Sequence, residues 1–296
     1  TEADMEKLDA LKYAQRLSSY VSRTTVGKSP LVRGIKQLAR RALERWFSQD
    51  GVLIAPVHGL RMSVPAGRYL YVYRAYEPYT TELFANFART NAAVLDIGAC
   101  FGYYSLLAAQ ALEPGGVVYA FEPSPESFAV LVRNIELNGY TDRIVPLRKA
   151  VGARSETRTL HLSTFAENNS LSSSPLFPTP EEIEVAAVSI DEILQDQRVA
   201  LIKMDIEGLE PRALEGMRRT LERNRDVVLF TELNVETLRA LNVEPAVFLA
   251  QLQALGFHVQ LIDETGHRLL PVTAEAIGMA ELEPGRYSNL LCVRKD

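Results

Sequence analysis

From about residue 78 onward, short apolar segments alternate regularly with amphipathic segments of helical period. Examples of the apolar segments are AAVLDI (92–97), VVYAFE (117–122) and ALIKMDI (200–206). The segments between them include amphipathic stretches at 103–112 and 125–138. Apolar strands that alternate with such helices predict an α/β fold with a parallel sheet covered on both faces. Right-handed crossovers make the sheet doubly wound, and ligands then bind at the C-terminal edge of its strands.

The first 75 residues differ from this pattern and are expected to form an N-terminal extension of helices and a β-hairpin. Helical patterns cover 3–22 and 29–47, and residues 52–73 contain short strands around Gly and Pro turns. Residues 1–50 carry ten Lys or Arg and six acids, so ten minus six gives a charge of +4. We interpret the basic helix 29–47 as a lid or dimer element, which makes a homo-oligomer one of the expectations. Two alternatives stay open: contact with an anionic membrane surface, or a solvated charged face.

Overall composition restricts the class of partner and the compartment. The net charge of −5 gives no general attraction to nucleic acid. The two cysteines, Cys100 and Cys292, make neither a disulfide framework nor a metal-ligand cluster. No apolar run approaches the roughly 20 residues that span a bilayer, and no signal-peptide pattern opens the chain. A cytoplasmic setting is therefore expected.

The stretch VLDIGACFGYYS (94–105) joins an expected strand to an expected helix. Gly98 and Gly102 let the backbone turn sharply and approach a ligand, and the helix that follows points its N-terminus at the same place. Glu122 ends the next strand, where an acid can accept hydrogen bonds from both hydroxyls of a ribose. Together these features predict a cofactor that contains adenosine.

The carboxylate of Asp96 favours one such cofactor over another. It would repel the pyrophosphate of a dinucleotide, and the spacing here is D-x-G-x-x-x-G and not G-x-G-x-x-G. S-adenosylmethionine (SAM) carries a sulfonium and an ammonium group, which Asp96 would attract. The alternative is structural, because Asp96 could simply cap a turn and Glu122 could begin one.

Several further segments, taken in order, resemble the FkbM-type SAM-dependent methyltransferases. Besides residues 94–109, they are AFEPSPESFAVLVRNIELNG (120–139), SIDEIL (189–194), LIKMDIEGLEPRALEGM (201–217) and FTELN (230–234). The resemblance covers roughly residues 75–296. It implies the class I methyltransferase fold, a Rossmann-like seven-stranded sheet whose last strand is antiparallel. It also implies methyl transfer from SAM, usually to an oxygen of a sugar or a secondary metabolite. The chain departs from the family at Cys100, where Asn is common, and at Asn234, where His is frequent.

The resemblance also assigns cofactor residues within the expected SAM-binding catalytic domain, residues 76–296. The methionine end would contact Asp96, Gly98, Ala99 and Gly102, with Tyr103, Tyr104 and Ser105 as weaker candidates. Glu122 would hold the ribose, and Pro123 and Ser124 would border the adenine. Ala150 and Val151, at the end of the third strand (143–151), are assigned to the adenine, although plain sheet core is an equal alternative.

The catalytic candidates are three carboxylates near the same sheet edge: Asp205 first, then Glu207, then Glu232. An alcohol acceptor must lose its proton as the methyl group is transferred, so a carboxylate base or acceptor orienter is expected there. Asp205 and Glu207 lie two residues apart, so on an extended strand their side chains point the same way. The pair could also hold Mg or Mn, although no metal is expected. The structural alternative is that these acids cap the following helix, and for Glu210 this alternative is favoured.

The polar stretch 163–182 is expected to be a loop, and its length favours a functional role. Asn168, Asn169 and Ser170 could bind a polyhydroxyl substrate, or they could simply satisfy turns. His161 is the one histidine proposed as a base, with an ordinary strand residue as the alternative.

The leading hypothesis is an enzyme, an O-methyltransferase that acts on a hydroxyl of a sugar, glycan or secondary metabolite. The alternatives are a non-catalytic SAM- or adenosine-binding module, a NAD-dependent dehydrogenase, and a methyltransferase for another class of acceptor. Nucleic acid is not expected as the acceptor, because the chain has no N-P-P-[YFW] segment and no Pro-Cys nucleophile.

Overall fold

A computed structural model describes residues 52–65, 76–163, 169–171, 181–273 and 288–294. The expected helices at 3–22 and 29–47, with their lid, dimer or membrane interpretations, lie outside the described residues. The chain divides into two units, residues 1–75 and 76–296, and each is described by itself. In the first unit, strands β1 (Val52–Val57) and β2 (Leu60–Pro65) form an antiparallel hairpin. His58 and Gly59 make its two-residue turn with φ values of 48° and 80°, as right-handed strand twist favours.

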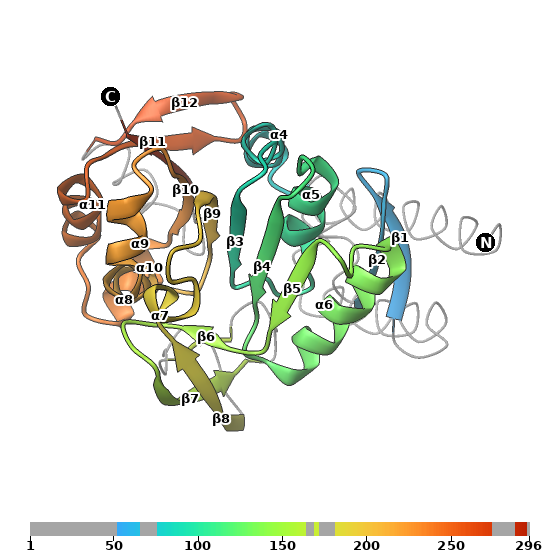
Figure 1. The fold of residues 1–296 in the computed structure, drawn as a ribbon. Coiled ribbons are helices and arrows are strands. Elements are labelled where there is room, and N and C mark those ends of the chain that lie inside the picture. Colours follow the sequence, from blue (N-terminus) through green and yellow to red (C-terminus); the bar gives the residue numbers. More distant parts are fainter. Residues whose placement is uncertain (1–51, 66–75, 164–168, 172–180, 274–287, 295–296) are drawn as a thin grey trace, which may run out of the picture. The chain divides into compact units, whose positions relative to one another are not determined.

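The second unit is built on a mixed sheet with the strand order β12-β11-β13-β10-β9-β3-β4-β5 (Figure 1). Its bounds are β3 Ala93–Ile97, β4 Val117–Phe121, β5 Ile144–Leu147, β9 Val199–Met204, β10 Val228–Leu233, β11 Phe257–Asp263, β12 Arg268–Pro271 and β13 Ser288–Arg294. Strands β5, β4, β3, β9 and β10 run parallel to one another, and β13 is antiparallel to β10 and β11. The doubly wound sheet with an antiparallel last strand is therefore confirmed, and β12 adds an eighth strand at the edge next to β11.

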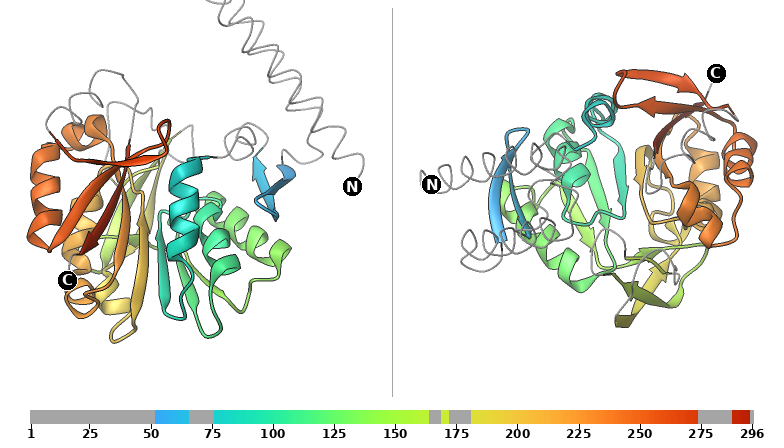
Figure 2. Two further views of the ribbon diagram at one scale, coloured as in Figure 1. Left: turned by 90° about the horizontal axis from the view of Figure 1, so that it is seen from above. Right: turned by 180° about the vertical axis from the view of Figure 1, so that it is seen from behind.

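Helices cover both faces of this sheet, as Figures 1 and 2 show. One face carries α4 (Pro78–Phe87), α5 (Tyr103–Ala111) and α6 (Pro125–Asn138). The other carries α7 (Ile190–Ile193), α8 (Glu210–Gly216), α9 (Arg218–Arg223), α10 (Val235–Ala240) and α11 (Pro245–Ala254). Alternate residues of β3 face the two layers: Leu95 and Ile97 join the core under α8 to α11, whereas Asp96 faces α5. No helix of the described ranges is both long and apolar enough to cross a membrane.

The expected third strand, 143–151, is in fact two strands in two different sheets. β5 ends at Leu147, and the chain bends there because the Lys149 amide donates to the Leu147 carbonyl at 2.8 Å. β6 (Ala150–Val151) then pairs with β8 (Glu181–Val188), which also pairs with β7 (Glu156–Leu162). This three-stranded sheet stands beside the main one, and β8 takes up the last two residues of the expected loop 163–182.

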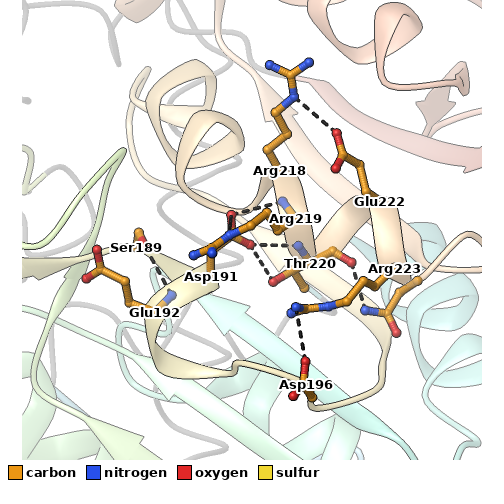
Figure 3. A network of polar contacts seen from close by, with 10 residues as sticks. Ser189, Asp191, Glu192, Asp196, Arg218, Arg219, Thr220, Glu222 and Arg223 are labelled. Atoms are coloured by element: carbon orange, nitrogen blue, oxygen red, sulfur yellow. Dashed lines mark hydrogen bonds and ion pairs between the residues drawn. The ribbon is translucent and has the colours of Figure 1, made fainter.

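The SIDEIL segment ties α7 to α9 (Figure 3). Asp191 accepts hydrogen bonds at Oδ1 from the Thr220 amide (2.7 Å) and hydroxyl (2.8 Å), and at Oδ2 from the Arg219 amide (3.0 Å). The N-cap residue of α9, Met217, offers no side-chain cap of its own. Asp191 therefore satisfies the first amides of α9 from a distant part of the chain.

Replacing Asp191 by Ala is expected to lower the free energy of unfolding by about 2 to 3 kcal/mol, because both amides lose a charged acceptor. Asp191→Asn keeps one acceptor oxygen, so about half of this loss is expected. Urea unfolding of wild type, Asp191→Asn and Asp191→Ala measures whether their stabilities fall in that order. Equal stability of Asp191→Ala and wild type would show that solvent caps α9 equally well.

Candidate functional site

A pocket opens at the C-terminal edge of the sheet, where the loops after β3, β4 and β9 meet the second sheet. The sequence candidates that line it are Gly98, Glu122, Pro123, Ala150, Val151, Asn169, Ser170 and Asp205. Residues not anticipated as lining are Cys100, Phe121, Lys149, Leu160, Leu171, Ile206 and Leu209. The pocket is thus lined by two carboxylates, one lysine and a largely apolar wall.

Gly98 makes the sharp turn on which this pocket depends. Its φ is +85°, and the Gly98 and Ala99 amides both donate to the Phe121 carbonyl, at 3.0 and 2.9 Å. A Cβ at Gly98 would lie 1.9 Å from the carbonyl oxygen of Asp205. Glycine is therefore required for the turn after β3 to pack against the end of β9. Ala99 itself does not line the pocket.

Gly102 makes the second turn, directly before α5. Its φ is +88°, and a Cβ there would lie 2.6 Å from Cδ1 of Leu131 in α6. The second glycine of the motif therefore permits close packing of α6 on the start of α5. Gly102 does not itself line the pocket.

Glu122 lies immediately after β4 with its carboxylate buried between backbone amides. Oε2 accepts from the Cys100 amide at 2.9 Å, and Oε1 accepts from the Ser124 amide at 2.8 Å. Burial raises the pKa of Glu122 to about 7, although the two amides oppose this shift. Each oxygen has a second lone pair, so Glu122 can still accept hydrogen bonds from a ligand in the pocket.

Asp96 lies below the pocket and does not line it. Its side chain is 2% exposed, and Ser105 donates its hydroxyl to Asp96 Oδ2 at 2.5 Å. Burial raises the pKa of Asp96 to about 6. Asp96 and Ser105 thus bond to each other, and their predicted contact with the methionine end stays a prediction.

Three other cofactor candidates make contacts outside the pocket. The Tyr103 hydroxyl lies 3.0 Å from Oγ1 of Thr81 in α4, and the Tyr104 hydroxyl donates to Glu77 Oε2 at 2.5 Å. The Ser124 hydroxyl accepts from the Ser127 amide at 3.5 Å as the N-cap of α6. These contacts give all three a structural role, and their roles toward a cofactor stay predictions.

Of the three catalytic candidates, only Asp205 lines the pocket. It follows β9, its side chain is 26% exposed, and its Oδ2 lies 3.1 Å from Nζ of Lys203. The expectation that Glu207 points the same way on an extended strand is wrong. β9 ends at Met204, and Glu207 is in a left-handed turn with φ 56°.

Glu232 lies in β10 and is 5% exposed. Burial, followed by the charges of Asp205, Glu207 and Glu210, raises its pKa well above the usual value. Its Oε2 has no hydrogen-bond partner within the described ranges. Glu210, favoured as a helix cap, is buried, and its Oε1 accepts from the Ile206 amide at 2.9 Å. Its carboxylate therefore holds the turn between β9 and α8.

Of the substrate candidates in and near the loop 163–182, some line the pocket and some do not. Asn169 and Ser170 line the pocket, and Asn169 Oδ1 also accepts from the Ser163 amide at 2.8 Å. His161 does not line it, because it lies on β7 with Nδ1 3.1 Å from Glu182 Oε1. Asn168 lies outside the described residues. Within the described part of the chain, no group of three or more His, Cys, Asp or Glu could hold a metal.

Two charged residues near Asp205 were not predicted from the sequence. They are Lys203, which is ion-paired with Asp205, and Glu77, whose charge acts on Lys203. Both are buried, at 1% and 7% exposure. A lysine inside the otherwise apolar segment ALIKMDI was the available signal, since lysine is almost never fully buried without partners. Glu77 gave no sequence signal, because only the folded chain brings it to Tyr104.

The buried acids of the site predict how stability depends on pH. Burial raises the pKa of Asp96 to about 6 and those of Glu122 and Glu210 to about 7, all above their ordinary values. The folded state therefore keeps protons that the unfolded chain has already released, so stability falls as pH rises through this window. Each acid contributes up to about 1.4 kcal/mol per pH unit. We expect a higher free energy of unfolding at about pH 5 than at about pH 7.5, measured in urea.

Glu122→Gln provides the control, because the amide does not titrate. Its stability should fall less steeply over the same range. A wild-type protein that becomes more stable between these two pH values would contradict the prediction.

Comparisons with known proteins give a family for the chain and several related methyltransferases. The family model described as methyltransferase FkbM domain matches residues 96–259. The 31-O-demethyl-FK506 methyltransferase FkbM of Streptomyces tacrolimicus is 30% identical over 179 residues, which are 51% of this chain and 66% of that protein. The hexuronic acid methyltransferase AglP of Haloferax volcanii is 25% identical over 152 residues, 50% of this chain and 59% of that protein. A transmembrane O-methyltransferase of Propithecus coquereli is 42% identical over 68 residues, 23% of this chain and 24% of that protein. The chain thus spans less than two thirds of the length of each relative.

Proposed function

Because the chain belongs to the FkbM methyltransferase family, we propose that it transfers a methyl group from SAM to a hydroxyl of a sugar, glycan or secondary metabolite. The observation that carries the proposal is one pocket with Glu122 and Asp205 in its lining and the Gly98 turn between their strands. The matched relatives are named as methyltransferases, one for a hexuronic acid and one for 31-O-demethyl-FK506. These two different acceptors support a hydroxyl group as the methyl acceptor, and they do not point to one particular compound.

The pocket has the chemistry that SAM requires. Glu122 can accept from ribose hydroxyls, and Phe121 and Val151 offer an apolar wall for the adenine. The buried Asp96, in β3 two residues before Gly98, suits a donor with a sulfonium and an ammonium group. The same carboxylate would repel a pyrophosphate, which disfavours a NAD-dependent dehydrogenase.

In the proposed reaction, SAM supplies a methyl group that the sulfonium already activates. The protein must hold an acceptor hydroxyl in line and remove its proton. Asp205 is proposed to take this proton, and its partly exposed carboxylate in the pocket lining, ion-paired with Lys203, supports that role. Asn169 and Ser170 lie on the same lining and are proposed to orient the acceptor.

The first test is calorimetry with SAM and with NAD. We expect binding of SAM alone, and a loss of affinity of about tenfold or more in Glu122→Ala, because the ribose loses a charged acceptor. Glu126→Ala is the matched control, because Glu126 is an exposed acid in the first turn of α6. Binding of NAD in place of SAM would refute the proposal.

The second test is a screen with SAM carrying a radiolabelled methyl group against sugars, polyketides, peptides and catechols, with and without chelator. Label in a hydroxyl-bearing product supports the proposed activity. Tight SAM binding without any transfer would favour a non-catalytic SAM-binding module. Transfer to amines or carbons only would place the acceptor in another class.

A further inference from the structure

Lys203 is a completely buried cation directly beneath the proposed site. It lies in β9 in register with Asp96 of β3 and Phe230 of β10, so the three side chains share the sheet face covered by α4 and α5. A buried ammonium group is costly unless it is paired and hydrogen-bonded. Its partners therefore indicate why the chain keeps a lysine in a central strand.

The charged and aromatic partners of Lys203 come from several different elements of the fold. Nζ of Lys203 lies 3.1 Å from Asp205 Oδ2 and 5.1 Å from the centre of the Tyr104 ring. Burial alone would lower the pKa of Lys203, but the charges of Asp205, Glu77 and Glu232 outweigh burial and raise it. The surrounding acids therefore favour the charged form of Lys203, and Asp96 on the neighbouring strand adds a further acid.

Only one of these four acids reaches the pocket. Glu77, Asp96 and Glu232 are 7%, 2% and 5% exposed and do not line it, whereas Asp205 is a lining residue. Tyr104 donates to Glu77, which fixes the far side of the cluster. The ion pair between Lys203 and Asp205 thus joins the pocket to a rigid, buried set of charges.

We propose that Lys203 is a positioning residue, which fixes the orientation of the Asp205 carboxylate in the pocket. The proposal rests on the proposed function, in which Asp205 takes the proton of the acceptor. Without the ammonium group, the carboxylate of Asp205 would face the acids Glu77 and Glu232 with no cation between them. The carboxylate would then rotate away from its place.

The test compares wild type, Lys203→Met and Lys203→Arg. With an acceptor from the screen, Lys203→Met should lower kcat about a hundredfold, the size of a general-base contribution. SAM affinity and the KM for the acceptor should change less than about threefold, because Lys203 touches neither. Lys203→Arg, which keeps the charge, should recover at least roughly a tenth of wild-type kcat.

Thermal unfolding shows whether each variant is folded, and a merely structural lysine would reduce stability without lowering the kcat of the folded protein. If Lys203→Met does not fold, Lys203→Arg and nitrogen-15 magnetic resonance of the Lys203 side chain decide. An unchanged kcat in a folded Lys203→Met protein would overturn the proposal.

A second measurement does not depend on an acceptor. A buried ammonium exchanges its protons slowly, so Lys203 should give a side-chain signal in nitrogen-15 magnetic resonance that Lys203→Met or Lys203→Arg removes. Asp205→Asn should shift this signal, and Asp226→Asn, a change at an exposed acid, should not. No shift in Asp205→Asn would overturn the ion pair. If the wild type binds no SAM and methylates nothing while the shift is present, the proposed function fails and the positioning role fails with it.

Discussion

Asp205→Asn is expected to reduce methyl transfer about a hundredfold to ten-thousandfold while SAM binding stays close to wild type. The amide has the size of the carboxylate but cannot accept the proton of an acceptor hydroxyl. Asp205 is also the one carboxylate of the three catalytic candidates that lines the pocket. Single-turnover kinetics with radiolabelled SAM measure the loss, and calorimetry measures SAM affinity.

Two control variants sharpen this prediction. Asp226→Asn removes an acid that is 63% exposed and paired with Arg198, so its turnover should equal that of wild type. Glu232→Gln should keep kcat within about threefold, because Glu232 is buried in β10 and does not line the pocket. If Glu232→Gln were the inactive variant and Asp205→Asn the active one, the base would be Glu232.

Gly98→Ala is expected to lower the free energy of unfolding by more than about 4 kcal/mol and to abolish SAM binding. The new Cβ would lie 1.9 Å from the Asp205 carbonyl oxygen and 3.2 Å from Cγ2 of Ile206, and φ is +85°. Backbone must move to relieve the first of these contacts, which separates the ends of β3 and β9. Urea unfolding and calorimetry measure the two effects.

Gly115→Ala is the matched control for backbone strain alone. Gly115 has φ +91°, and a Cβ there would meet no heavy atom within 4 Å. Its expected cost is about 1 to 2 kcal/mol, the usual penalty for a left-handed alanine. Equal costs at the two positions would show that the contact with Asp205 contributes nothing.

The regular alternation after residue 78 was sufficient to predict the doubly wound sheet, because apolar strands and amphipathic helices have different periods. The Gly98 turn and Glu122 were predictable for a related reason, since both lie at strand ends, where the topology brings ligands. Predictions from local sequence pattern failed at two places where the backbone departs from regular strand geometry. The bend at Leu147 moves Ala150 and Val151 into a second sheet, and the left-handed Glu207 breaks the extended geometry assumed for it. Neither departure is visible as a change in hydrophobic pattern.

The buried charges could be predicted only in part. A lysine in a central strand signals that partners must exist, but the partners come from the segment before α4, from β10 and from the turn after β9. Glu77 and Glu232 are brought to Lys203 by the tertiary fold alone. Their roles depend on distances that neither propensity nor periodicity contains.

The second sheet has a consequence for how acceptor preference can diverge among related chains. Leu160 faces the pocket, and the next residue on β7, His161, is paired with Glu182 of β8 instead. Because successive side chains alternate, a slip of one residue between β7 and β8 would exchange an aliphatic wall for an imidazole. Such a slip leaves the hydrogen bonds of the parallel sheet untouched. The side of the pocket next to β7 can therefore change during evolution while the side proposed to bind SAM stays constant.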